Sequence, residues 1–308
     1  MAVTLIEAAK QSQDAKRSAI IETYARSHDI LRVMPFENVT GGVLRRNQEG
    51  SLPSTGFRGL NEGYTESSGA LAPKSEQLTI AGGDLDVDVA IVEWHGQKSR
   101  TTQELMKTKS LAHTIGHKFV KGDSLSAVKE FDGLQVRSVG NQLVANGASP
   151  DGDVLSLAKL DELIDTVDNP THLIMSKAVR RSLTVAARTT TVGGNITHEK
   201  DEFGRQITMY NDLPILIADP NSSLYATLAF DEANPGGGSN VGTSIYCVSF
   251  QPGMLVGIQS KDIDVRDLGE LATPVVWRTR VEWYVSIAPL HPRSFARLWG
   301  IKAGAVVA

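Results

Sequence analysis

The side chains most able to do chemistry in this sequence are its seven histidines and its single cysteine. His113 and His117 stand four residues apart, which on a helix is the spacing of two zinc ligands. Thr114 occupies the position at which a metalloprotease helix carries a glutamate, so we expect both to be ordinary surface or interface histidines. Cys247 has no second cysteine to pair with, which excludes an intrachain disulfide and a cysteine-based zinc cluster. We expect it to be a small buried side chain.

Three alternating aspartates, Asp84, Asp86 and Asp88, resemble the opening of a calcium-binding loop. That loop needs glycine at its sixth position and a bidentate glutamate at its twelfth, where this sequence has Val89 and His95. The glycine motifs of phosphate-binding loops, dinucleotide-binding folds and nucleophile elbows do not occur in the sequence. We therefore predict no metal site, no cofactor and no catalytic residue, and expect that the protein is not an enzyme.

The composition favours a globular chain. Of its 308 residues, 41% are hydrophobic and 21% are charged. The formal net charge of -4 gives no overall basic field that would draw the protein onto nucleic acid or an anionic membrane. No apolar run approaches the ~18 residues of a membrane span, and the first thirty residues lack the apolar region of a signal peptide. These features favour a protein that works or is assembled in a reducing cytosol.

Apolar periodicity predicts two long helices. The first covers 99–121, with Ser99 or Thr101 as its cap, and the second covers 153–168, with Asp153 as its cap.

Shorter elements surround these helices. We predict strands over 82–94 and 172–175, a helix that runs from a Ser176 cap to Arg188, and an exposed loop or hairpin over 189–206. Alternating helices and short strands make the middle section, about 151–260, an α/β or α+β domain.

The most regular strand pattern lies near the C-terminus, where apolar and polar side chains alternate over a length about twice that of a typical strand. One face carries Trp277, Val281, Trp283, Val285 and Ile287, and the other carries Arg278, Arg280, Glu282 and Tyr284. We expect residues 294–302 to supply its partner strand. We also expect the long helix 99–121 to pack on this sheet, with the middle section inserted between them.

The segment 51–78 has no such periodicity. It is rich in glycine, its charges are few and balanced, and its large apolar side chains are too dispersed to collapse on one another: Leu52, Phe57, Leu60, Tyr64, Leu71 and Leu78. We infer that it lies along another surface. We also expect the N-terminal arm to lack an adequate place within its own fold and to need a partner surface. Together with this arm and an elongated sheet, the segment predicts self-assembly in which many weak contacts act together around a closed shell.

Four stretches, in this order, resemble the major capsid protein of tailed bacteriophages, which has the Hong Kong 97-type fold. They are KGDSLSAVKEFDGL, THLIMSKAVRRSL, FGRQITMYNDLPILIAD and VVWRTRVEWYVSIAPLHPRSFARLWG. The resemblance extends over nearly the whole chain, because the expected order of arm, extended loop, long helix, inserted domain and long strands also matches.

The resemblance implies an α+β fold with five parts. These are an N-terminal arm (1–36), an extended E-loop hairpin with its flanking strands (37–92), the first part of a peripheral domain with the spine helix (93–150), an inserted axial domain (151–260) and the second, long-stranded part of the peripheral domain (261–308). It implies two sets of contacts with neighbouring subunits. The E-loop set is Phe57, Arg58, Leu60, Glu62, Tyr64, Glu66, Lys74 and Glu76, and the peripheral-strand set is Arg278, Arg280 and Glu282.

The implied function is an icosahedral head shell, built in the host bacterial cytoplasm, that encloses double-stranded DNA without binding it specifically. The implied partners are further copies of the chain as hexamers and pentamers, a scaffold or none, a portal and cement or decoration proteins, with no membrane. Some members of the family crosslink a loop lysine to an asparagine near the long strand. Lys74 could be that lysine, but 262–300 contains no asparagine, so we predict no such bond. Because the arm starts almost at Met1, we also expect no large N-terminal scaffolding region to be cleaved.

Other classes of protein remain open from the sequence. An encapsulin-type compartment would have the same fold and enclose an enzyme cargo instead of DNA. An extended phage tail or adhesin protein would form tubes or fibres, and an enzyme would form a small oligomer with turnover. Particle shape and particle contents distinguish these alternatives.

Overall fold

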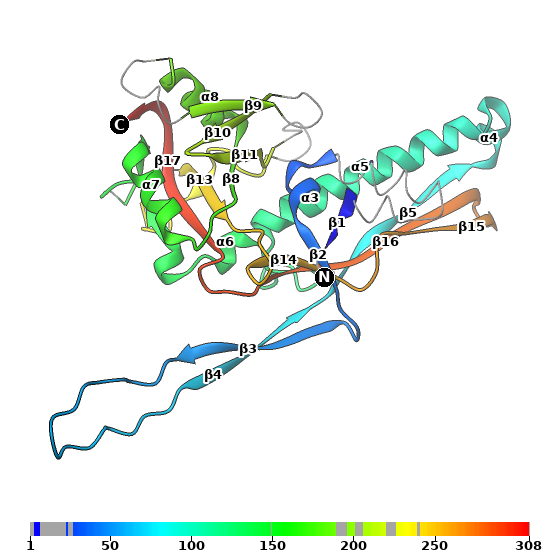
Figure 1. The fold of residues 1–308 in the computed structure, drawn as a ribbon. Coiled ribbons are helices and arrows are strands. Elements are labelled where there is room, and N and C mark those ends of the chain that lie inside the picture. The colour runs from blue at the N-terminus through cyan, green and yellow to red at the C-terminus, as the bar shows by residue number, and fades with distance from the viewer. Residues whose placement is uncertain are drawn as a thin grey trace.

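The computed structural model describes residues 3–6, 23, 27–148, 150–188, 196–200, 206–219, 226–238 and 241–307. It has an α+β fold, as expected, in which two sheets form the body and a separate two-stranded hairpin projects from it (Figure 1). No helix in the described part of the chain is long and apolar enough to cross a membrane.

A 25-residue helix, α5 (Gln97–Lys121), runs along the elongated half of the body (Figure 1). The prediction for 99–121 is therefore confirmed, although the expected side-chain cap is wrong. The helix starts after Gly96, whose φ of 77° suits glycine, and no side chain caps it. Its inner face buries Leu111, Ile115 and Phe119.

The smaller sheet lies beside α5. Its strands are β1 (Val3–Thr4), β2 (Pro35–Asn38), β14 (Leu255–Gln259), β16 (Val275–Pro289), β15 (Asp264–Ala272) and β5 (Thr79–Asp88), with β16 paired to β14 and β15 along one edge and to β5 along the other. The alternation predicted for β16 is confirmed, because Val281, Trp283 and Val285 are buried. The strand predicted over 82–94 ends at Asp88, whose carboxylate accepts a hydrogen bond from the Ala90 N–H at 2.8 Å and caps helix α4 (Val89–His95).

The larger sheet contains β6 (Leu143–Ala145), β17 (Phe295–Val307), β13 (Val241–Val248), β8 (His172–Met175), β11 (Leu213–Ile217), β10 (Gln206–Tyr210) and β9 (Ile196–Lys200), in that order, with β12 (Glu232–Ala233) on β13 and β7 (Asp153–Ser156) on β17. Residues 294–302 were expected to pair with the long strand. That pairing is wrong, because β17 pairs with β13, β6 and β7 instead. The last part of the chain is therefore divided between the two sheets.

The helix predicted over 153–168 also needs correction. Residues 153–156 form β7, and helix α7 (Leu157–Thr166) starts after Ser156. The strand at 172–175 and the Ser176 cap of helix α8 (Lys177–Ala186) are confirmed. Of the predicted loop 189–206, residues 189–195 and 201–205 lie outside the described residues, and 196–200 pair with β10 as β9.

Two large apolar cores and a smaller cluster around Val256 and Ile258 fill the body. One lies between the larger sheet and helices α7 and α8, and it contains the buried Cys247, as expected. Burial raises the pKa of the Cys247 thiol to about 12. The other core joins the opposite face of the same sheet to α5, the smaller sheet and helix α3 (Asp29–Val33). Alternate residues of β13 enter the two cores, so this strand connects them.

Most of the predicted arm, 1–36, lies outside the described residues. Where the structure describes it, Leu5, Ile30 and Leu31 are fully buried in the core around α5. The expectation that the arm lacks a place within its own fold is therefore wrong for these parts of it.

Candidate inter-subunit surface

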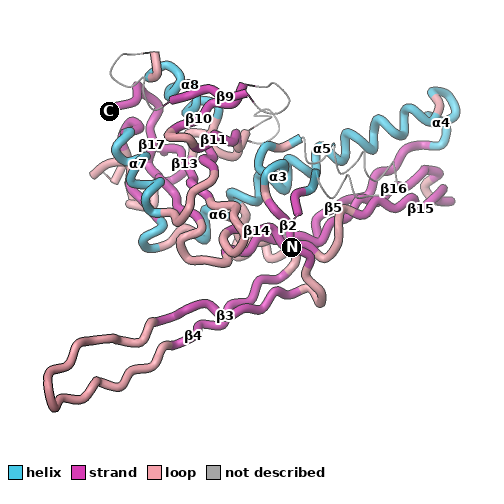
Figure 2. Tube along the Cα trace, in the orientation of Figure 1, coloured by secondary structure: helices cyan, strands magenta, loops and turns pink. Residues whose placement is uncertain are grey.

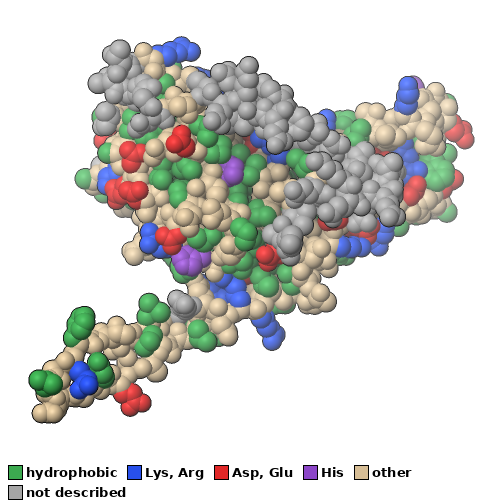
Figure 3. Space-filling view, viewed as in Figure 1, with side chains coloured by type: hydrophobic (Ala, Val, Ile, Leu, Met, Phe, Trp, Pro, Cys, Tyr) green, Lys and Arg blue, Asp and Glu red, His purple; other side chains and the backbone are tan. Residues whose placement is uncertain are grey.

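The hairpin consists of β3 (Val43–Ser51) and β4 (Ala70–Gln77), joined by the tip 52–69. It stands clear of the two sheets (Figures 1 and 2). Its large apolar side chains point into solvent, with Phe57 109%, Leu60 97% and Leu52 77% exposed. Hydrophobic side chains spread along the outer half of the hairpin are also visible in Figure 3. A two-stranded hairpin without a packed face is at best marginally stable in water, so this segment needs another surface.

The tip has some internal structure. A carboxylate oxygen of Glu62 accepts the Gly59 N–H at 2.9 Å, and Arg58 donates to the Glu62 carbonyl at 3.3 Å. The Arg58 guanidinium also lies 5.4 Å from the centre of the Tyr64 ring. These contacts shape the turn while leaving its apolar side chains exposed.

The base of the hairpin is tied to its own body. Arg137, on helix α6 (Leu134–Arg137), donates two hydrogen bonds of 2.7 Å to the Glu76 carboxylate, and its Nε donates to the Asp132 carbonyl. On the other strand, Arg46 donates to the Leu290 carbonyl. Glu76 anchors the hairpin within the chain through this pair, and its expected contact with a neighbouring copy stays a prediction. Glu66 and Lys74 form no ion pair with a described residue.

The polar face of β16 is paired with neighbouring strands of the same sheet. Arg278 binds Asp86 at 2.6 and 2.7 Å, Arg280 binds Asp84 at 2.7 and 2.8 Å, and Glu282 pairs with Arg266. Hydrogen bonds from the two arginines lower the pKa of both aspartates.

Asp84 and Asp86 are thus engaged in ion pairs, and among the described residues neither belongs to a group of three or more metal-ligating side chains. Contacts of Arg278, Arg280 and Glu282 with a second subunit stay a prediction. In any such contact, these three side chains would also keep their ion pairs within the chain or would have to give them up.

A buried polar cluster, which was not predicted from the sequence, joins α5 to the smaller sheet. Arg100 forms an ion pair with Asp267 at 2.6 Å, donates to the Thr279 hydroxyl at 2.9 Å and lies 5.2 Å from the centre of the Trp277 ring. Thr279 in turn donates to Glu104 at 2.9 Å. The sequence does contain a sign of this cluster. Arg100 and Glu104 are four residues apart, on the same face of the helix as its apolar residues.

His113 and His117 are half-buried, and they lie beside the fully buried His28. The rings of His28 and His113 are 6.3 Å apart, and His28 shares a hydrogen bond of 3.2 Å with the Ala218 carbonyl. Gly116 makes room for this packing, because a Cβ there would lie 2.3 Å from the His28 ring. Burial, followed by the charge of His113, lowers the pKa of His28 to about 4. No group of metal-ligating side chains occurs within the described ranges.

Neither a protein-family model nor a curated protein matches the sequence. The structure is similar to solved ones. One is the encapsulin SrpI of Synechococcus elongatus PCC 7942 in its holo complex (TM-score 0.67, 15% identity, 91% of this chain and 89% of that chain). A second is the capsid of a native GTA particle (TM-score 0.61, 13% identity, 88% and 89%). A third is from Mycobacterium phage Cain (TM-score 0.56, 12% identity, 96% and 97%).

These similarities cover almost the full length of both chains in each comparison, and together they show that the chain has the Hong Kong 97-type capsid fold. The fold predicted from the sequence is therefore confirmed. At 12–15% identity, the similarity establishes the fold and leaves function to be argued from the surfaces.

Proposed function

We propose that this protein is the major capsid protein of a tailed double-stranded DNA bacteriophage and that it assembles into the icosahedral head shell as hexamers and pentamers. The observation that carries the proposal is the projecting hairpin, whose apolar side chains are exposed although large apolar cores are buried in the body. Such a surface is typical of a subunit that is completed by its neighbours. The capsid fold supplies the geometry for this assembly.

The two sheets suggest how the parts would divide. The smaller sheet with α5 would form the peripheral domain, and the larger sheet with α7 and α8 would form the axial domain near capsomer centres. In this proposal β17 belongs to the axial domain, although it lies within the expected peripheral range 261–308. β14 belongs to the peripheral domain, although it lies within the expected axial range 151–260. Scaffold, portal and decoration proteins are further proposed partners.

Enclosed DNA would be held without tight binding to the shell, because the net charge of -4 offers no general attraction for phosphates. The similarity to a holo encapsulin supports one second candidate, a protein compartment with enzyme cargo.

Expression of the chain, size-exclusion chromatography and electron microscopy test the proposal. We expect closed shells. Tubes or fibres would favour a tail or adhesin protein, and a small oligomer would contradict the shell. Nuclease-protected DNA in particles from the native source would support the phage head, whereas a co-purified enzyme would support the compartment.

A sharper test replaces the tip 52–69 by Asn-Gly, the preferred two-residue turn between paired strands. The strand pairing from Val43–Gln77 to Ser51–Ala70 would be kept. We expect a folded subunit with an unchanged thermal midpoint that no longer forms shells. Normal assembly of this variant would show that the tip is not needed.

A further inference from the structure

Helix α8 carries a concentration of positive charge that the chain as a whole lacks. Residues 177–188 contain four basic residues and no acidic residue, although the formal net charge of the chain is -4. Val179 and Leu183, on the inner face of the helix, are buried against the larger sheet. The basic side chains are all exposed, and they form what we call the basic stripe: Lys177, Arg180, Arg181 and Arg188.

The basic stripe runs along one side of the helix. Arg181 is four residues from Lys177 and seven from Arg188, which is the spacing of side chains that share a helix face. Ala187 keeps a helical backbone, so this spacing holds as far as Arg188. The distance along the helix from Arg181 to Arg188 is about 11 Å.

The three arginines of the stripe are not neutralised within the described part of the chain, where none of them forms an ion pair or a side-chain hydrogen bond. The strand β17, against which α8 packs, contains Arg297 and Lys302 and no acidic residue. The charge of α8 is therefore available to an external anion.

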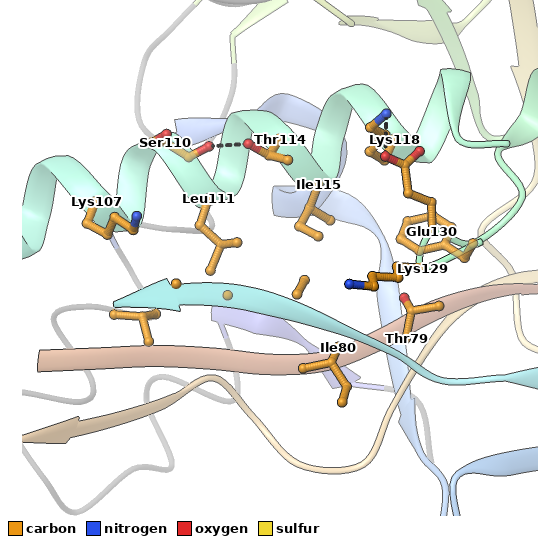
Figure 4. Close-up of a pocket in the computed structure, with 15 residues that line it drawn as sticks. Thr79, Ile80, Lys107, Ser110, Leu111, Thr114, Ile115, Lys118, Lys129 and Glu130 are labelled. Carbon is orange, nitrogen blue, oxygen red and sulfur yellow. Dashed lines mark hydrogen bonds and ion pairs between the residues drawn. The ribbon is translucent and has the colours of Figure 1, made fainter. Parts of the chain in front are cut away.

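Lysines elsewhere on the body differ in this respect. A cavity of about 280 Å³ between α5 and β5 has several lysines around it (Figure 4). Lys118 pairs there with Glu130 at 2.7 Å, and the charge of Lys107 acts on Asp84. The basic stripe is thus a better candidate for an anion-binding surface than this cavity.

The position of α8 keeps the stripe accessible. The helix and the hairpin lie on opposite sides of the body (Figure 1). Contacts that a subunit makes through its own hairpin therefore leave its α8 uncovered.

The phosphate backbone of double-stranded DNA suits this surface. A guanidinium group can donate two parallel hydrogen bonds to one phosphate. DNA carries one negative charge per ~1.7 Å of its axis, so about 11 Å of helix meets more phosphates than it has arginines, in any register. Val185 is the one large apolar residue exposed on α8, so the helix lacks the apolar face with which a helix binds a membrane.

We propose that the outer face of α8 binds the phosphate backbone of the enclosed DNA through Arg180, Arg181 and Arg188, without reading its sequence. This inference rests on the proposed function, and it places α8 at the inner surface of the shell. About three phosphates per subunit give a weak contact, but many copies act together. DNA would then be retained without tight binding to any one subunit.

The first test measures binding of the unassembled subunit to short, dye-labelled double-stranded DNA by fluorescence anisotropy, between about 50 and 200 mM NaCl. We expect the logarithm of the binding constant to fall with the logarithm of the salt concentration with a slope of about -2.7 for three phosphate contacts. The variant Arg180→Gln/Arg181→Gln/Arg188→Gln should bind at least tenfold more weakly at the lowest salt and lose this slope.

The matched control is Lys98→Gln/Lys109→Gln/Lys129→Gln, which removes the same charge from exposed side chains far from α8. It should bind DNA within twofold of the unmodified chain. Equal losses in both variants would show that only net charge matters, and absence of binding by the unmodified chain would also overturn the proposal. Stronger binding to polyglutamate or to phosphatidylglycerol vesicles than to DNA would mean that an acidic protein or a membrane is the partner instead.

The second test uses the unmodified protein, so it does not depend on the folding of a variant. The arginine reagent phenylglyoxal is applied with and without DNA, and the modified peptides are quantified by mass spectrometry. We expect DNA to slow the modification of Arg180, Arg181 and Arg188 at least threefold and to leave the exposed Arg58 of the hairpin tip unchanged. Equal rates with and without DNA at all three arginines would overturn the proposal.

Electron microscopy of the same preparations separates this inference from the proposed shell. If shells form and DNA binding is independent of the three arginines, the inference is wrong although the shell stands. If only a small oligomer forms while DNA binding depends on these arginines, the DNA-binding surface stands and the shell proposal fails.

Discussion

The hairpin and the smaller sheet are both built from antiparallel strands, but their apolar side chains have opposite fates. In β16, Trp283 and Val285 are at most 1% exposed, whereas Phe57 and Leu60 at the tip are essentially fully exposed. The sheet is stabilised by packing against α5. The hairpin is held by its own ladder of hydrogen bonds and, at its base, by polar contacts and the packing of Leu44, while its tip has no such support among the described residues. Burial therefore separates the part of the chain that makes the fold from the part that, in the proposed shell, contacts neighbouring subunits.

The largest expected effect lies in the body. Trp283 is fully buried against Phe36, and its indole N–H donates to Gln259 at 3.0 Å. Trp283→Ala should lower the free energy of unfolding by about 3–5 kcal/mol. Urea unfolding of the unassembled subunit measures this. A change below about 1 kcal/mol would mean that the sheet does not carry the stability assigned to it.

Lowering the pH should also reduce the free energy of unfolding. The folded pKa of His28 is about 4, and the unfolded value is near 6.5, so the unfolded chain binds the proton more tightly. The contribution of His28 is fully present above pH 6.5 and is lost as the pH falls toward 4, by about 2–3 kcal/mol at pH 4.5. His113 and His117, whose pKa values burial also lowers, act in the same direction.

Urea midpoints between pH 7.5 and 4.5 test this dependence. We expect His28→Gln to show a weaker dependence on pH than the unmodified chain. Equal slopes would show that other groups cause the loss.

A smaller effect is expected at the junction between hairpin and body. Glu76→Gln removes the charge that pairs with the half-buried Arg137, which should cost about 1–2 kcal/mol locally. Amide hydrogen exchange should become faster in β3 and β4 and stay unchanged in β16. Glu66→Gln, whose side chain has no ion pair with a described residue, is the matched control and should change neither.

The smallest effect on stability is expected at the tip. Phe57→Ser should change the free energy of unfolding of the unassembled subunit by less than about 0.5 kcal/mol, because the ring is already in water. The same change should impair shell formation, as scored by electron microscopy. A stability loss above 1 kcal/mol would show that Phe57 packs within its own chain.

The sequence was sufficient to locate α5 and to assign the faces of β16, because each has one buried and one exposed side and so shows a clear period. It failed for β17, whose residues 295–301 are all buried. A strand covered on both faces has no alternation, and nothing local identifies its partner. It failed at 153–156 because Asp153 and Ser156 are both good caps, and only the pairing of β7 with β17 decides between them.

The exposure of the apolar side chains at the tip could be predicted from the sequence, because these side chains are widely spaced in a glycine-rich segment. The pairing of Glu76 with Arg137, 61 positions away, could not be predicted because it depends on tertiary placement. The same holds for Arg278 and Arg280, whose partners come from β5.

The continuity of β4 with β5 has a mechanical consequence. Only Leu78 separates the two strands, and β5 is registered with β16 from Thr79–Val285 to Asp88–Val276. A pull on the tip would act along β5, at right angles to the hydrogen bonds of this antiparallel ladder. All of them would be loaded in shear at once instead of being unzipped one by one, so tension at the tip would be spread over the long axis of the subunit.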